Sequence, residues 1–175
     1  MYPYRKETEA VIYLTEPVPR LDSSALRHLV EQSNMLLSPG PVRLCVHPTP
    51  SADFHEMYIV HRQGNYLRPH RHTDKDEAGI LLEGEMDVFL FNDAGDVTER
   101  ICCGNYLSGQ VFHVRIPQGI WHCQVVRSPY VLFYEATTGP FNREKMEFAP
   151  FSPEVGADES ENYFKSLLEI RGQRL

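Results

Sequence analysis

Short apolar or alternating runs, separated by turn-forming residues, fill the chain from residue 42 to about residue 138. Alternation of apolar and polar side chains with period two is typical of strands that have one buried face. Glycines at positions 64, 84, 95 and 119 fall between the runs and mark turns. Eight strands are predicted, at residues 56–62, 66–72, 78–82, 86–92, 97–101, 110–116, 122–126 and 131–137. This pattern favours a closed all-β barrel or jelly roll, because closure protects the strand edges.

A helix is predicted on each side of these strands. Asp22 can cap a helix over residues 22–37, since its carboxylate can accept first-turn N–H groups and apolar residues recur on one face. A shorter helix is predicted over residues 158–171, where Asp158 and Glu161 have the spacing of a capping box. We therefore expect one domain over residues 1–175. It comprises an N-terminal extension (1–41), a barrel core (42–138) and a C-terminal extension (139–175).

Charge and composition narrow the choice of partners and compartment. The formal net charge is −7 and no run of Lys or Arg occurs, so we expect no nucleic-acid partner. No apolar stretch approaches the roughly 18 residues that span a bilayer. The first residues also lack a secretory pattern, so we expect a cytoplasmic protein with no membrane partner. The four cysteines include no CxxC pair, which favours free thiols.

Two histidines separated by one residue, His70 and His72, stand in a predicted strand. Because side chains alternate along a strand, both project from the same face and can bind one ion together. Glu77 follows after a short turn and can bring a carboxylate to the same point. In a closed barrel, His122 can face these residues across the interior. The sequence therefore predicts a metal site made by His70, His72, Glu77 and His122.

This donor set suits one divalent ion of Fe, Mn, Ni, Co, Cu or Zn. In an octahedral ion the four ligands leave two positions for water or substrate, and an open coordination sphere favours catalysis. The alternative is that the histidines are exposed or satisfied within the core and that Glu77 is solvated in a turn. The joint spacing Gly-x5-His-x-His-x4-Glu-x6-Gly makes that interpretation the weaker one.

The spacing at residues 64–84, together with Pro-x-Gly-x2-His at residues 117–122, resembles the two sequence motifs of the cupin superfamily. The resemblance implies a double-stranded β-helix, often dimeric, with the ion held inside by the four residues named above. The second motif departs from the family pattern, because Val111 and Val126 replace its usual Gly and Asn. We expect a homodimer on this basis.

A narrower resemblance, to the WbuC family of cupin-fold metalloproteins, covers most of the chain. It implies an association with cell-surface polysaccharide synthesis but supplies no established reaction. The residues that carry it are Arg43, His47 and the segments 67–72, 82–85, 89–93, 116–122 and 148–154.

Two arginines near the first motif are candidate substrate-binding residues. Arg68 shares strand parity with His70 and can point into the same cavity, and Arg62 lies nearby in the sequence. A guanidinium suits a phosphate or carboxylate group of a substrate. The alternative is that these charges are solvated or balance neighbouring acidic residues.

Two aromatic residues and four further histidines are expected to lie outside the metal site. Trp121 and Tyr66 are expected to pack against the outside of the barrel. His47, His55 and His61 lack a spaced partner and are expected to be structural. His113 alternates with the apolar Phe112 and Val114 and is expected to be exposed.

The leading functional hypothesis is a metal-dependent enzyme that acts on a small-molecule ligand, a polar metabolite such as a sugar or nucleotide-sugar, with the ion polarising a carbonyl or hydroxyl oxygen. An isomerase or epimerase is one reaction class that fits it. No general base is identifiable from the sequence. One alternative is an Fe(II)-dependent dioxygenase, and another is a non-catalytic ligand-binding or sensor protein.

Overall fold

The computed structural model describes residues 2–36 and 40–170 and is built mostly of strands. The strands form two sheets, ordered β1-β2-β3-β4-β11-β6-β9 and β12-β5-β10-β7-β8. The strands are β1 (Tyr4–Thr8), β2 (Val11–Leu14), β3 (Val42–Cys45), β4 (Phe54–Arg62), β5 (His70–His72), β6 (Glu77–Glu83), β7 (Glu85–Phe91), β8 (Val97–Gly104), β9 (His113–Ile116), β10 (Trp121–Val126), β11 (Tyr130–Thr138) and β12 (Met146–Phe148). The helices are α1 (Ser23–Met35), the short 3-10 helix η1 (Arg143–Lys145) and α2 (Ser160–Glu169).

The two sheets enclose an apolar core between their inner faces. Met57 and Phe133, from β4 and β11 of the larger sheet, share one buried cluster with Val88 and Val126, from β7 and β10 of the smaller sheet. Strands β4 and β11 are far apart in the chain, yet they pair in antiparallel register over all their residues. The predicted all-β jelly roll with an N-terminal helix and a short C-terminal helix is confirmed.

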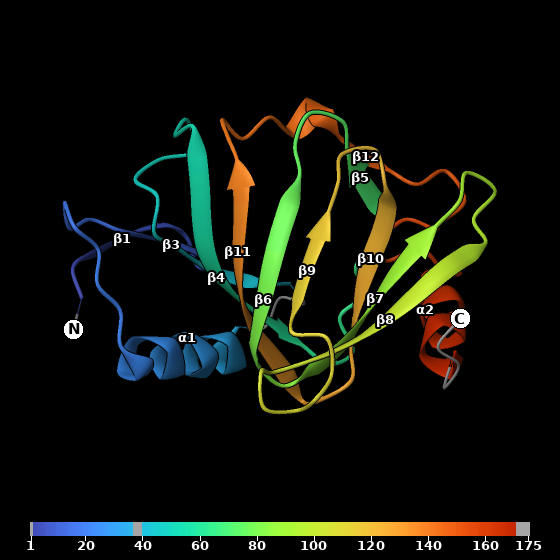
Figure 1. The fold of residues 1–175 in the computed structure, drawn as a ribbon, viewed down its shortest axis with the longest axis horizontal. Coiled ribbons are helices and arrows are strands. Elements are labelled where there is room, and N and C mark those ends of the chain that lie inside the picture. The colour runs from blue at the N-terminus through green and yellow to red at the C-terminus, as the bar shows by residue number, and fades with distance from the viewer. Residues whose placement is uncertain (1, 37–39, 171–175) are drawn as a thin grey trace.

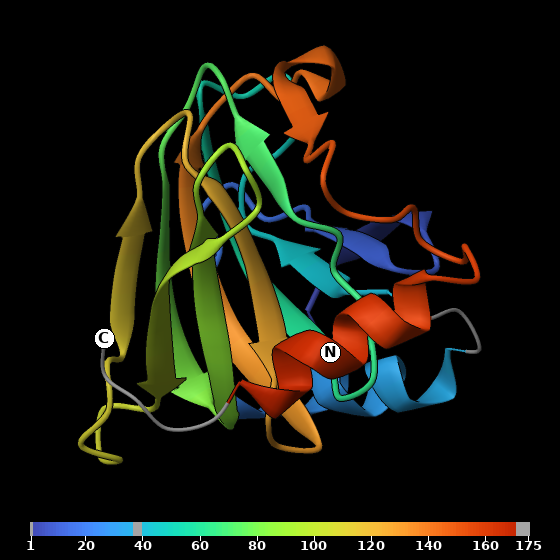
Figure 2. The same cartoon turned by 90° about the vertical axis from the view of Figure 1, so that its right-hand side faces the viewer.

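The two α-helices cover different parts of the sheets. Figure 1 shows α1 beside the N-terminal strands and α2 beside β7 and β8, and Figure 2 shows α2 in front of the strands with α1 behind them. Leu29 of α1 packs in a buried cluster with Val42 of β3 and Val60 of β4. Phe164 of α2 packs instead with Trp121, which confirms that this tryptophan faces away from the space between the sheets.

Asp22 caps α1 as predicted. Its carboxylate accepts hydrogen bonds from the backbone N–H groups of Ser24 and Ala25, which satisfies donors that have no partner inside the helix. The helix ends at Met35, and Leu37, where the predicted helix stops, lies outside the described residues. Neither helix of the described ranges has the length and hydropathy that a bilayer crossing requires.

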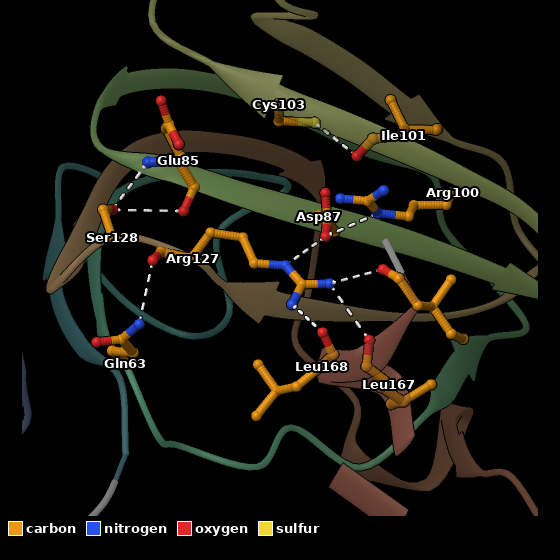
Figure 3. Close-up of polar contacts among 11 residues, drawn as sticks. Gln63, Glu85, Asp87, Arg100, Ile101, Cys103, Arg127, Ser128, Leu167 and Leu168 are labelled. Carbon is orange, nitrogen blue, oxygen red and sulfur yellow. Dashed lines mark hydrogen bonds and ion pairs between the residues drawn. The ribbon is translucent and has the colours of Figure 1, made fainter. Parts of the chain in front are cut away.

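A buried cluster of charged residues holds α2 against the smaller sheet (Figure 3). The carboxylate of Asp87 is 2% exposed, pairs with Arg100 at 2.9 Å and accepts a short hydrogen bond from Arg127. The guanidinium of Arg127 also donates to the carbonyl oxygens of Leu167 and Leu168 at the end of α2, at 3.2 and 2.8 Å. Arg127 thereby satisfies helix-end carbonyls and places its positive charge where the helix dipole favours it.

The N-terminal segment contributes more to the sheet than the sequence predicted. Residues 1–41 were expected to form a helical extension, but β1 and β2 pair with each other and β2 then pairs in parallel with β3. Ile12 and Leu14 of β2 are buried in the cluster that α1 covers. This pairing depends on residues distant in sequence, which a short local pattern does not reveal.

Three other predicted boundaries were wrong. The strand expected over residues 66–72 is confined to His70–His72, because Pro69 has no N–H to donate to a ladder. The strand expected over residues 110–116 begins at His113. Helix α2 begins at Ser160 after Glu159, with no side-chain cap, so Asp158 does not form the expected capping box. The four cysteines are free, as predicted.

Candidate metal centre

Three of the four predicted ligands converge between the sheets. His70 of β5 pairs directly with His122 of β10 in the smaller sheet, and Glu77 is the first residue of β6 in the larger sheet. One ligand atom from each of His70, Glu77 and His122 lies within 4.8 Å of the others. The site therefore joins both sheets, as the prediction required.

Backbone hydrogen bonds fix which nitrogen of two imidazoles faces the site. Nδ1 of His70 lies 3.1 Å from the carbonyl oxygen of Arg68, and Nδ1 of His122 lies 2.9 Å from that of Ile120. A carbonyl oxygen only accepts hydrogen bonds, so each Nδ1 carries a proton, and Nε2 is the nitrogen that each ring has left to bind an ion. This arrangement is the usual way in which proteins orient histidine ligands.

The carboxylate of Glu77 is surrounded by basic groups. Its Oε1 lies 2.9 Å from Nε2 of His72 and 3.4 Å from Nζ of Lys75, and its Oε2 lies 3.4 Å from Nε2 of His122. Burial raises the pKa of Glu77. Hydrogen bonding to His122 and His72 and the charge of Lys75 lower it by a larger amount, so the net pKa lies below its ordinary value. Burial, followed by the nearby His122, lowers the pKa of His70 to about 4. Near neutral pH the site thus combines an ionised carboxylate with a neutral His70.

The donor set fits a cation. Nε2 of His122 and Oε2 of Glu77 face each other at 3.4 Å. A ring nitrogen and a carboxylate oxygen at this separation need a proton or a metal ion between them. Nitrogen and oxygen donors from imidazole and carboxylate suit a divalent transition ion.

His72 lies beside this group rather than within it. Its ring is 5.4 Å from that of His70 and 6.4 Å from that of His122 between centroids, and its direct partner is Glu77. Arg71, between the two histidines, points the other way and lies over the ring of Trp121 at 4.1 Å. The predicted shared face of His70 and His72 is confirmed by this alternation.

Two loops are tied together beside the site. The backbone N–H of Gly119 donates to the carbonyl oxygen of His72 at 2.7 Å. The N–H of Gln118 donates to Oδ1 of Asp76 at 2.8 Å. These bonds connect the turn before His122 with the loop between β5 and β6, and so fix the relative position of ligands from the two motifs.

The site opens into a cavity of about 610 Å³ between the sheets. His70, His72, Glu77 and His122 all line it. Three histidines predicted to be structural also line it: His47, His55 and His61. They are buried, and His47 and His55 stack with ring centroids 4.0 Å apart. Their position follows from barrel closure, and no local spacing in the sequence indicates it.

Glu135 is a second carboxylate in the cavity wall that sequence reasoning missed. It lies on β11 opposite Gly79 of β6, on the strand that neighbours the one carrying Glu77. Burial and the charge of Glu77 raise the pKa of Glu135 to about 7, against the opposing charge of Arg43. A carboxyl group of this kind can exchange a proton near neutral pH.

The structure does not bring the two predicted substrate-binding arginines to the cavity. Arg68 donates to Ser152 and to the carbonyl oxygen of Ala149, at 3.3 and 3.4 Å, in the C-terminal extension. Arg62 is exposed at the end of β4 and donates to the carbonyl oxygen of Ser33. The expectation for Arg68 assumed a regular strand through residues 66–72, and the irregular backbone before His70 removes that parity.

The fold and the site define the class of protein: a jelly roll of the cupin type with a candidate His-Glu-His metal centre between its sheets. Comparison with solved structures supports the fold. A protein from Shewanella oneidensis is 16% identical, with a TM-score of 0.50 over 73% of this chain and 80% of that one. A variant of oxalate decarboxylase from Bacillus subtilis is also 16% identical with a TM-score of 0.50, over 64% of this chain and 29% of that one.

Other comparisons are narrower. The KdgF protein of Halomonas sp. is 23% identical, with a TM-score of 0.45 over 63% of this chain and 87% of that one. A family model described as a domain of unknown function, DUF6016, matches residues 41–103, a range that contains His70, His72 and Glu77 but not His122. No curated protein matches the sequence.

Proposed function

We propose that this chain is a metal-dependent enzyme of the isomerase or epimerase type that acts on a small polar metabolite, such as a sugar or nucleotide-sugar. The observation that carries the proposal is the convergence of His70, Glu77 and His122, from two sheets, at the wall of a cavity of about 610 Å³. A cavity of this size suits a small-molecule ligand. The sugar class and a role in cell-surface polysaccharide synthesis follow from the resemblance to WbuC proteins.

The chain's own residues have distinct roles in this proposal. His70, Glu77 and His122 hold one divalent ion, and His72 is the fourth ligand or orients Glu77 through their 2.9 Å contact. When bound, the ion supplies Lewis acidity that polarises a carbonyl or hydroxyl oxygen of the substrate. Backbone contacts to both Nδ1 atoms keep the imidazoles in the tautomer that ligation needs.

Glu135 is the candidate proton-transfer group. It is a partly buried carboxyl in the same cavity and lies outside the set of convergent ligand atoms. An isomerase or epimerase that works by proton transfer removes a proton from carbon and returns it, and a carboxyl group held beside the substrate can do both. Glu135 therefore supplies the general base that the sequence alone did not identify.

Exchange of carbon-bound hydrogen with solvent tests this proposal. Metal-loaded protein is incubated in D₂O with a panel of sugars and nucleotide-sugars, and deuterium uptake is measured by mass spectrometry. The expected result is uptake into at least one compound, a loss of uptake in Glu135→Gln, and unchanged metal content in that variant. Uptake that persists in Glu135→Gln removes the residue's assigned role.

The same samples separate the alternative functions. If the iron-loaded protein consumes oxygen while it converts a substrate, and conversion stops under anaerobic conditions, the proposal is replaced by a dioxygenase. Tight binding of a compound without conversion under any metal would replace it with a binding or sensor protein. A cytoplasmic homodimer remains the expected form, and sedimentation of the purified protein tests the dimer.

A further inference from the structure

The cavity contains an arginine that makes no direct ion pair, although its charge lowers the pKa of Glu135. Arg43 of β3 lies opposite Ile59 of β4 and lines the cavity together with it. Other cations inside the molecule face carboxylates: Arg100 and Arg127 pair with Asp87, and Lys75 pairs with Glu77. Within residues 2–36 and 40–170, the Arg43 side chain has no ion pair and no hydrogen bond. A partly buried guanidinium without such partners is costly unless a ligand supplies them.

A second unpartnered polar group lies on the same face of the larger sheet. His61 of β4 is 3% exposed, lines the cavity, and stacks on Phe133 with ring centroids 5.7 Å apart. Its Nδ1 is buried and has no hydrogen-bond partner. Because Arg43 pairs with Ile59, His61 is the diagonal neighbour of Arg43 on the inner face. The two side chains thus present unfilled hydrogen-bonding capacity to one part of the cavity.

The side chains that line the cavity carry a net positive charge, which favours an anionic ligand. Arg43, Lys75 and Arg143 line it, against the carboxylates Glu77 and Glu135. Even with both carboxylates ionised, the cations outnumber them, and a divalent metal ion would add to the excess. An excess of positive charge in a partly enclosed cavity attracts an anion.

We propose that the cavity binds a small oxyanion, either a carboxylate or a phosphate group of the metabolite, through Arg43, with His61 as a second hydrogen-bonding group. The rest of the ligand then extends toward His70, Glu77 and His122, which line the same cavity. This inference rests on the proposed function and names its substrate class as an acidic metabolite. Arginine suits the task because its planar guanidinium can form two parallel hydrogen bonds with a carboxylate or phosphate.

Calorimetric titration of the full chain with malonate and with inorganic phosphate tests the assignment. Each probe is titrated into metal-loaded protein and into protein dialysed against a chelator, because either anion can also bind the ion itself. The variants are Arg43→Gln, Arg43→Lys, which keeps the charge, and Arg20→Gln, a control for the same charge change at an exposed site. Thermal unfolding and metal analysis of each variant report folding and the metal centre separately.

We expect at least one probe to bind the protein that was dialysed against a chelator. The affinity of Arg43→Gln for that probe should be weaker by a factor of about ten or more. Arg43→Lys should retain part of the binding and Arg20→Gln all of it. The relative affinities of malonate and phosphate identify the preferred oxyanion. Equal affinity in the wild type and Arg43→Gln, or no binding of either probe to the wild type, overturns the assignment. Failure of the chain to retain metal would contradict the proposed metal centre but would leave the chelated-protein titration valid.

Discussion

His70 and His122 lie directly opposite each other in antiparallel strands, with ring centroids 4.5 Å apart. Each ring donates its Nδ1–H to the carbonyl oxygen two residues earlier in the chain. The same local arrangement thus occurs in two segments that are distant in the sequence, and it leaves Nε2 as the nitrogen of each ring that can bind an ion.

Replacement of His72 by Ala tests how far the metal centre extends beyond the three convergent residues. His72 contacts Glu77 at 2.9 Å, so its loss removes either a ligand or the group that orients one. We expect the metal affinity to fall by about 10-fold to 100-fold. A competition titration against a coloured chelator measures this change, and an affinity equal to that of the wild type would exclude His72 from the site.

Two glycines with nearly the same φ angle allow backbone strain to be measured separately from steric overlap. Gly84 has φ +85° and a Cβ there would lie 2.2 Å from the carbonyl oxygen of Tyr130, whereas Gly64 has φ +87° with open space around it. We expect Gly64→Ala to lower the free energy of unfolding by about 1–2 kcal/mol. Gly84→Ala should lower it by about 1–3 kcal/mol more. Urea unfolding of both variants measures the difference, and equal losses would contradict the close approach at Gly84.

The charged cluster beneath α2 is expected to stabilise the fold strongly. Asp87→Asn removes the negative charge between Arg100 and Arg127 in a buried position, and such a loss costs about 3–5 kcal/mol. Hydrogen exchange should also rise in residues 160–169, because Arg127 binds the end of that helix. Glu161→Gln is the control, since its exposed pair with Lys165 should leave the unfolding midpoint unchanged. A mild effect of Asp87→Asn would show that the arginines find other partners.

The stability of the chain should depend on pH through His61. Burial, followed by the charges of Arg43 and His70, lowers the pKa of His61 from 6.5 to about 3. The unfolded chain therefore takes up a proton as the pH falls below 6.5 while the native state does not, and stability decreases over that range. Between pH 7 and pH 5, chelated wild-type protein should lose about 2 kcal/mol more than His61→Phe. Urea unfolding at the two pH values measures this, and parallel losses would contradict the prediction.

The ligands in the first motif could be predicted because their signal is local. Period-two alternation places His70 and His72 on one face, and a short turn is enough to bring Glu77 alongside. His122 could be predicted from chain order and barrel closure, and the pairing of β5 with β10 provides the contact.

The rest of the cavity could not be predicted because it depends on pairing between distant strands. Arg43, His61 and Glu135 come from β3, β4 and β11, and each carries no spaced partner in its own segment. Their shared inner face emerges only from the registers of β3 with β4 and of β4 with β11. Conversely, Arg68 was misplaced because a period-two argument was applied to a segment that is not a strand.

The metal content of purified and metal-reconstituted protein tests the central claim most directly. His122→Ala removes one convergent ligand, and His113→Ala removes an exposed histidine on β9 as a matched control. Elemental analysis after dialysis should find about one divalent ion per chain in the wild type and in His113→Ala, and little in His122→Ala. Equal metal content in all three proteins would show that the ion, if any is bound, lies elsewhere.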